Sequence, residues 1–115
     1  RRRGDPAAVT VTDRFHLGSC GKAMTAALIG RLVEERLLRW DATVDDLFPD
    51  DRARVNPRLR SATLIHLLTH RSGLPEPEMS VWRAIDGTGG GARERRADLA
   101  RRVLALEPTS PPGEE

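Results

Sequence analysis

The feature that most constrains this chain is the stretch of residues 18–30, GSCGKAMTAALIG, which contains its only lysine. Of the 19 Lys and Arg residues, the other 18 are all arginine. Small and apolar residues throughout the stretch predict a helix. On a helix, positions i and i+3 lie on one face about a turn apart, so the Lys22 amine can reach the Ser19 hydroxyl.

A serine beside a lysine is one known arrangement for nucleophilic catalysis. Arginine does not lose its proton in a protein, whereas a desolvated lysine can become neutral and accept one. A position at the start of a helix adds free backbone N–H groups and the positive end of the helix dipole near a developing oxyanion. Spacing alone leaves a second interpretation open, in which Ser19 only caps the helix.

Composition limits the possible partners. With 115 residues, 38% hydrophobic and 31% charged, the chain suits one globular domain or part of one. Acidic residues and arginines are interspersed, the net charge is only +2 and there is no tyrosine, so we expect no nucleic-acid partner. No apolar run approaches the roughly 18 to 20 residues that cross a bilayer. The single cysteine, Cys20, excludes an internal disulfide.

The first predicted helix runs from Cys20 to about Arg36. It is apolar on nearly every side in its first half, so we expect it to lie in a core. The side chains expected to be buried are Met24, Leu28, Ile29, Leu32 and Val33. A brief extended segment is expected before it, at residues 9–12.

Capping residues and turn residues locate the remaining elements. Asp41 or Thr43 is expected to cap a short helix over residues 44–48 that Pro49 ends, and residues 50–57 are expected to form a surface loop. Thr63 is expected to cap a helix over residues 64–70 that buries Leu64, Leu67 and Leu68. Beyond residue 74, proline and the glycines at 89–91 indicate turns and flexible connections, with one clear helix from Ala92 to about Leu106.

The sequence contains residues for two other kinds of site. His66 and His70 share a helix face and could bind a metal with Cys20 or His16, but no glutamate follows His66, so the His-Glu-x-x-His zinc pattern is absent. A helix packed by leucines explains these histidines better, and we expect no metal and no cofactor. Cys20 as nucleophile with a histidine base is the weaker alternative, because it leaves Lys22 without a role.

Three blocks, in order, carry a resemblance to a known family: residues 15–25 (FHLGSCGKAMT), 38–44 (LRWDATV) and 63–74 (TLIHLLTHRSGL). Together they resemble the serine beta-lactamase-related hydrolases, the group of class C beta-lactamases, D-alanyl-D-alanine carboxypeptidases and esterases. Residues 111–113 (PPG) look like the Pro-Gly that this family places before its Tyr-x-Asn motif. The resemblance implies that Ser19 is the acylated nucleophile and Lys22 its base, with a small-molecule or peptide substrate.

The resemblance also implies an α+β fold in which an antiparallel sheet is flanked by helices, beside an all-α region. This chain is then a mostly helical part of one such domain: residues 8–74 hold the nucleophile helix and following helices, and residues 75–115 begin the variable all-α region. The N-terminal strands and the C-terminal half of the domain are expected to be missing, so these residues alone should be inactive. A periplasmic or secreted location is favoured by the resemblance.

Departures from the family pattern limit what the sequence predicts. The chain lacks the tyrosine of the second motif. The Lys/His-Thr/Ser-Gly motif is absent too, because the only lysine is already used and residues 70–73 (HRSG) do not fit its context. Arg36 stands where the family usually has a helix-ending glycine. The reacting carbonyl could belong to a beta-lactam, a D-alanyl peptide or an ester. The alternatives are a non-catalytic helical interaction domain and a catalytically dead family member.

Overall fold

The computed structural model describes residues 4, 6–86 and 90–114. Helices dominate this part of the chain, and their bounds are α1 (Cys20–Glu34), α2 (Val44–Leu47), the 3-10 helices η1 (Pro49–Asp51) and η2 (Pro57–Leu59), α3 (Leu64–Leu68), α4 (Met79–Asp86) and α5 (Ala92–Leu104). The mostly helical character predicted from the sequence is confirmed. The sheet implied by the resemblance contributes no strand to the described residues, where the β pairing consists of one isolated bridge between Thr43 and Thr63.

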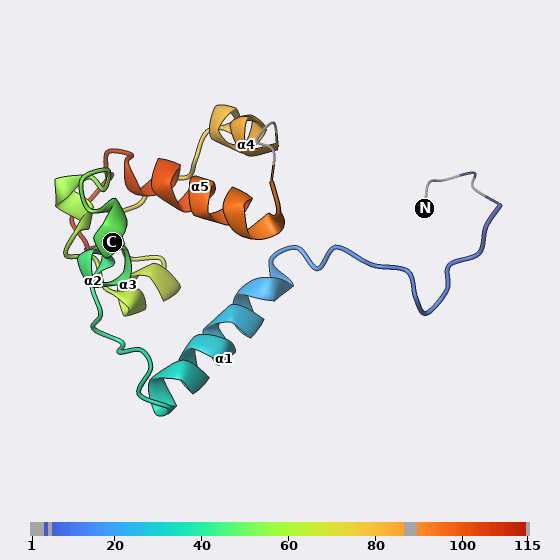
Figure 1. Ribbon diagram of the computed structural model, residues 1–115, viewed down its shortest axis with the longest axis horizontal. Coiled ribbons are helices and arrows are strands. Elements are labelled where there is room, and N and C mark those ends of the chain that lie inside the picture. The colour runs from blue at the N-terminus through green and yellow to red at the C-terminus, as the bar shows by residue number, and fades with distance from the viewer. Residues whose placement is uncertain (1–3, 5, 87–89, 115) are drawn as a thin grey trace.

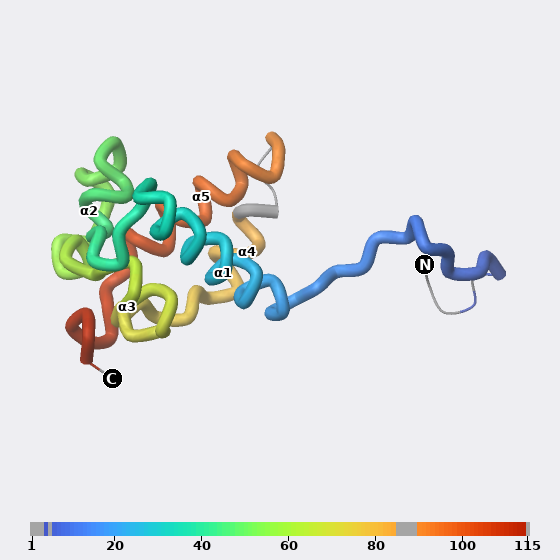
Figure 2. Tube along the Cα trace, turned by 90° about the horizontal axis from the view of Figure 1, so that it is seen from below, coloured from blue at the N-terminus to red at the C-terminus, as the bar shows by residue number. Residues whose placement is uncertain are grey.

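The N-terminal segment runs away from the helices (Figures 1 and 2). The prediction of an extended segment at residues 9–12 was wrong, because Thr10 and Asp13 close a turn there. The Asp13 amide donates to the Thr10 carbonyl at 3.1 Å, and the Thr10 amide donates to the Asp13 carboxylate at 2.7 Å. A local side-chain hydrogen bond thus outweighs the β-branched pattern.

Helix α1 ends at Glu34, two residues before the predicted end at Arg36, because Arg36 adopts a left-handed conformation with φ of 60°. The Leu37 amide then reaches back to the Leu32 carbonyl at 2.9 Å, which closes the helix in the Schellman manner. Arg36 therefore occupies a position that glycine fills at lower conformational cost.

The expectation that α1 lies deep in a core is not met within the described chain. None of its residues is buried, and Met24 and Leu28 are 65% and 59% exposed. Ile29, Leu32 and Val33 are half-buried. In Figure 1, α1 lies to one side of the other helices, so the described elements cover only part of its surface.

Two threonines begin α2 and α3 in the same way. Thr43, rather than Asp41, caps α2, and Thr63 caps α3 as predicted. In each case the threonine hydroxyl accepts from the backbone N–H three residues on, and the side chain at that position accepts from the threonine amide. Such reciprocal capping satisfies N–H groups that the first helical turn cannot pair internally.

Both short helices end earlier than predicted. Helix α2 stops at Leu47, and Pro49 opens η1 because proline suits the first position of a helix. Helix α3 stops at Leu68, since His70 takes a left-handed φ of 60°. Leu64 is buried as predicted, whereas Leu67 and Leu68 are only half-buried.

The region expected to be a surface loop, residues 50–57, instead contributes to the core. It carries η1 and the start of η2, and Val55 within it is 3% exposed. The core cluster consists of Val44, Val55, Leu59, Ala62 and Leu104, with Phe48, Leu67 and Leu74 packed against it. Because most of residues 50–54 are charged, the sequence pattern did not indicate this helical turn.

Helix α5 closes this core from the C-terminal half of the chain. It ends at Leu104, whose side chain is buried and whose carbonyl accepts the Asn56 amide at 2.8 Å. Helix α4, which packs against α5, was not predicted, because the prolines before it and the glycines after it indicated a loop. The glycine-rich connection predicted at 89–91 lies partly outside the described residues.

The last described segment is fastened to the end of α3, beside which it lies in Figure 2. The Gly113 amide donates to the Arg71 carbonyl at 2.7 Å, and the Arg71 guanidinium donates to the Gly113 carbonyl at 2.6 Å. Gly73, with φ of 78°, lies so close to Ser110 that a Cβ there would stand 2.0 Å from the Ser110 carbonyl oxygen. None of the helices described is long and apolar enough to cross a membrane.

Candidate active site

Ser19 and Lys22 are in direct contact at the start of α1. The Lys22 Nζ donates a hydrogen bond to the Ser19 Oγ at 2.9 Å, which confirms that the amine reaches the hydroxyl. Ser19 precedes the helix with φ of −66° and ψ of −14°, and its side chain makes no capping hydrogen bond. The interpretation of Ser19 as a helix cap is therefore not supported, and its hydroxyl is committed to the lysine.

The backbone before Ser19 is bent by Gly18, which has a φ of 54° and donates its amide to the His16 Nδ1 at 3.0 Å. His16 thus supports the turn that delivers Ser19 to the helix start. The amide of Lys22 donates to the Ser19 carbonyl at 3.0 Å. The amide of Ser19 itself has no acceptor among the described residues, which leaves a donor beside the nucleophile.

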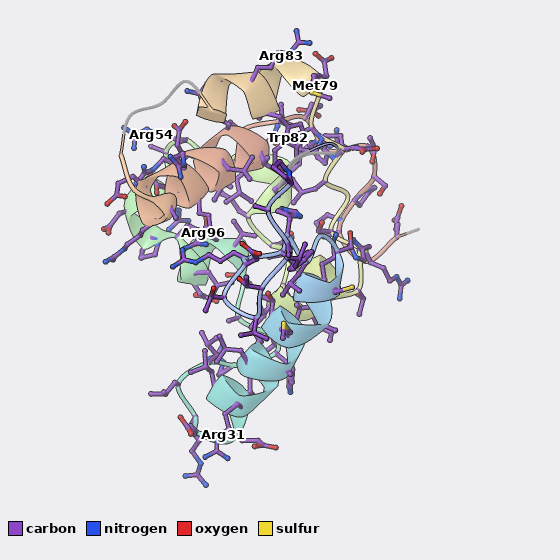
Figure 3. All side chains as sticks on the ribbon, turned by 90° about the vertical axis from the view of Figure 1, so that its right-hand side faces the viewer. Arg31, Arg54, Met79, Trp82, Arg83 and Arg96 are labelled. Carbon is purple, nitrogen blue, oxygen red and sulfur yellow. The ribbon has the colours of Figure 1, made fainter. Side chains whose placement is uncertain are left out.

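A cavity of about 710 Å³ lies between α1 and the other helices, and it is lined by Lys22 and by Gly18, the residue before Ser19. Its lining residues come from α1 and the turn before it, from α3 and the residue that follows its C-cap, and from α4 and α5: Gly18, Gly21, Lys22, Thr25, Ala26, Leu67, Leu68, His70, Trp82 and Arg96. Trp82 and Arg96 are labelled in Figure 3. Within the part of the chain that the structure describes, the lining residues are apolar, polar or basic and none is acidic.

The histidine pair is not arranged as a metal site. His66 uses its Nδ1 to accept the Thr63 amide at 3.3 Å, and His70 lies beyond the end of α3 in its left-handed conformation. Across residues 4, 6–86 and 90–114, no group of three His, Cys, Asp or Glu side chains could hold a metal ion. Cys20 is exposed and free next to Ser19.

Sequence reasoning missed Trp82 and Arg96 as site residues. Both belong to the C-terminal part of the chain, and Trp82 lies on α4, a helix that the sequence pattern did not predict. Ser19 and Lys22 could be found because they are neighbours on one helix. The approach of α4 and α5 to α1 depends on tertiary packing that no local pattern reports.

Comparison with known proteins gives a consistent picture. The family model described as Beta-lactamase matches residues 1–115. The unguisins hydrolase ungD' of Aspergillus campestris is 29% identical over 109 residues, which are 90% of this chain and 20% of that protein. The unguisins hydrolase ungD of Aspergillus violaceofuscus is 31% identical over 103 residues, covering 85% of this chain and 18% of that protein.

A bacterial relative shows the same similarity over a shorter stretch. Penicillin-binding protein 4 of Amycolatopsis lactamdurans is 38% identical over 72 residues, which are 63% of this chain and 19% of that protein. The chain thus spans about a fifth of the length of the curated relatives it matches. No solved structure matches it significantly.

Proposed function

The chain belongs to the beta-lactamase family, and from this premise we propose that its full-length parent is a serine hydrolase that works through an acyl-enzyme. Ser19 is the nucleophile and Lys22 its general base. The observation that carries the proposal is the 2.9 Å contact between the Lys22 amine and the Ser19 hydroxyl. A base must lie within hydrogen-bond reach of the proton that it removes, and this pair already meets that condition.

In the proposed reaction, a proton moves from the Ser19 hydroxyl to the Lys22 amine along this contact. In its neutral form the Lys22 amine accepts the hydroxyl proton while the Ser19 oxygen forms a bond to the substrate carbonyl carbon. The negative charge then rests on the former carbonyl oxygen, for which the free Ser19 N–H is a suitable donor. When the tetrahedral intermediate collapses, the leaving group departs with a proton, and water later releases the acyl group from Ser19.

The substrate class rests on the family and on the names of the relatives. Those names refer to hydrolysis of unguisins and to penicillin binding. For this protein we propose an acyl carbonyl of a beta-lactam, a D-alanyl peptide or an ester. The rest of the proposed α+β fold, including the sheet against α1 and the second and third motifs, belongs to the parent protein, for which we propose a periplasmic or secreted location.

The test is covalent labelling of the full-length parent. Intact mass is measured after exposure to a fluorophosphonate and, separately, to benzylpenicillin, with Ser19→Ala as the inactive variant and Ser61→Ala, at an exposed position outside the site, as the matched control. We expect an adduct in the parent and in the control but not in Ser19→Ala. Lys22→Arg keeps the charge but cannot accept the proton, so its acylation rate should fall by about 100-fold or more.

The labelling pattern also decides between the proposal and its rivals. The reagent that adds separates esterase-type reactivity from penicillin binding. A correctly folded parent that forms no Ser19-dependent adduct would refute the hydrolase and leave the interaction domain or the catalytically dead member. Retained acylation in Lys22→Arg would instead support Ser19 as the nucleophile and show that Lys22 is not its base.

A further inference from the structure

The cavity that Lys22 lines, next to the turn that carries Ser19, has a composition suited to particular ligands. Ala26, Leu67, Leu68 and Trp82 supply apolar surface, and none of the described residues brings a carboxylate to the space. Its volume of about 710 Å³ falls within the range of small-molecule sites, which are mostly apolar with a few placed polar groups. The polar lining residues are Lys22, Thr25, His70 and Arg96, of which Lys22 and Arg96 are the cations that an anionic group would contact.

Arg96 on α5 is the cation that remains available to a ligand. Three other arginines on the same helix are engaged: Arg95 donates to the Gly90 carbonyl at 3.2 Å, Arg101 pairs with Asp51 at 3.0 Å and Arg102 pairs with Asp98 at 2.8 Å. Arg93 does not line the cavity. Arg96 makes no hydrogen bond or ion pair with residues 4, 6–86 or 90–114, yet it lines the cavity. Its guanidinium is therefore available to an anionic group of a ligand in this space.

Lys22 cannot serve the same purpose. Its amine is bound to Ser19 at 2.9 Å, and as a base it must be neutral at the moment when it accepts the hydroxyl proton. Arg96 stays charged throughout and presents a planar pair of donors that matches a carboxylate. Binding and proton transfer are thus divided between the two residues. Arg96 binds an anionic group at one wall of the cavity, and Lys22 takes the proton from Ser19.

Trp82 supplies the surface on which the rest of a ligand would lie. It belongs to α4 and lines the cavity with Leu67 and Leu68 of α3. An indole next to leucines favours a flat apolar or aromatic group, for which burial and ring contacts contribute most. Arg96 and Trp82 come from the two helices that pack against each other, so both are set by the same local packing.

We propose that Arg96 and Trp82 make this protein selective for acyl substrates in which an apolar or aromatic group carries a carboxylate. Trp82 contacts the apolar group, and Arg96 binds the carboxylate. The inference rests on the proposed function, because it places the acyl group beside Ser19. It adds two specificity-determining residues to a site for which the sequence identified only the nucleophile and its base.

The kinetic test uses a matched pair of substrates on the full-length parent. The mono-4-nitrophenyl ester of terephthalic acid carries a carboxylate on the ring, and 4-nitrophenyl 4-carbamoylbenzoate carries a neutral amide in its place. We expect kcat/KM to favour the carboxylate by about tenfold, which corresponds to one charge-assisted contact. Arg96→Gln should remove most of this preference, and Arg96→Lys should retain part of it.

Control variants separate a local effect from a general loss of charge or structure. Arg93→Gln removes the same charge from an exposed position of α5 that does not line the cavity, and it should leave the substrate ratio unchanged. Trp82→Ala should lower kcat/KM for both esters alike, mainly through KM, while Trp82→Phe retains most of it. A ratio equal in the parent and in Arg96→Gln would overturn the proposal.

A binding measurement keeps this inference distinct from the proposed function. Calorimetric titration of the Ser19→Ala parent with 4-methylbenzoate and with 4-methylbenzamide requires no turnover. Tighter binding of the benzoate by about fivefold or more, lost in Arg96→Gln, would support the inference even if no ester were hydrolysed. Equal binding of the two compounds together with Ser19-dependent hydrolysis would overturn the inference and leave the hydrolase intact.

Discussion

Thr43 and Thr63 face each other across an isolated antiparallel bridge, and each caps the helix that begins immediately after it. The flanking backbone is paired reciprocally: the Val44 amide donates to the Ala62 carbonyl at 2.8 Å, and the Leu64 amide donates to the Ala42 carbonyl at 2.8 Å. All four flanking residues are buried. The starts of α2 and α3 are therefore one structural unit, held by backbone pairing in the middle and by hydroxyl caps at its edges.

Removing either cap should destabilise this unit. We expect Thr43→Ala and Thr63→Ala each to cost about 1 kcal/mol, the usual loss for a capping threonine. Hydrogen exchange on the full-length parent should show faster exchange of the Asp46 and His66 amides, because these amides donate to the two threonine hydroxyls. Thr12→Ala, in an exposed turn, is the matched control, and exchange rates no different from those of this control would contradict the role of the caps.

Arg36 provides a prediction in the opposite direction. It ends α1 at a φ of 60°, where an L side chain is strained and glycine is not. Arg36→Gly should stabilise the parent by about 0.5 to 1 kcal/mol, measured by chemical denaturation, and Arg36→Val should destabilise it. Gly30→Ala inside the same helix, where an added methyl would meet only Trp40 at 3.9 Å, controls for general glycine effects. Destabilisation by Arg36→Gly would show that the arginine side chain contributes more than its backbone costs.

The sequence predicted those parts of the structure that depend on neighbours along the chain. The contact of Lys22 with Ser19, the two threonine caps and the start of α1 all follow from residues within one helical turn. Helix α4 was missed because prolines precede it, glycines follow it, and the apolar pattern between them is short. The burial of Val55 in a charged segment and the position of Arg96 depend on packing between distant segments, which spacing does not encode.

Glu107 connects the C-terminal segment to residues 56 and 58 beside the core. This connection makes the stability of the fold dependent on pH. The Asn56 side-chain amide donates to the Glu107 carboxylate at 2.8 Å and Arg58 pairs with it, and these contacts hold its pKa below the ordinary value. A carboxylate with a lowered pKa stabilises the fold above the unfolded value of about 4.3, and this contribution is lost as the pH falls through the folded value. Glu107→Gln should therefore destabilise the parent at pH 7 and have less effect at about pH 3.

Chemical denaturation of the parent and Glu107→Gln at both pH values measures this difference. Glu114→Gln is the matched control, since Glu114 is exposed and its side chain has no partner among the described residues. A loss of stability that is the same at both pH values would mean that the charge of Glu107 is not responsible.

The exposed apolar surface of α1 allows a prediction that separates this chain from its parent. Met24 and Leu28 are 65% and 59% exposed here, whereas large apolar side chains in a folded protein are usually covered. The chain produced alone should therefore bind a hydrophobic dye and self-associate, without a sharp cooperative melt. Met24→Lys with Leu28→Lys should reduce both dye binding and self-association of the isolated chain.

If the proposed sheet covers this face of α1, the same double change should instead destabilise the full-length parent by several kcal/mol, because it buries two charges without partners. Val9→Lys with Val11→Lys, in the exposed N-terminal segment, is the matched control. A parent that tolerates the double change in α1 as well as it tolerates the control would show that this face stays uncovered.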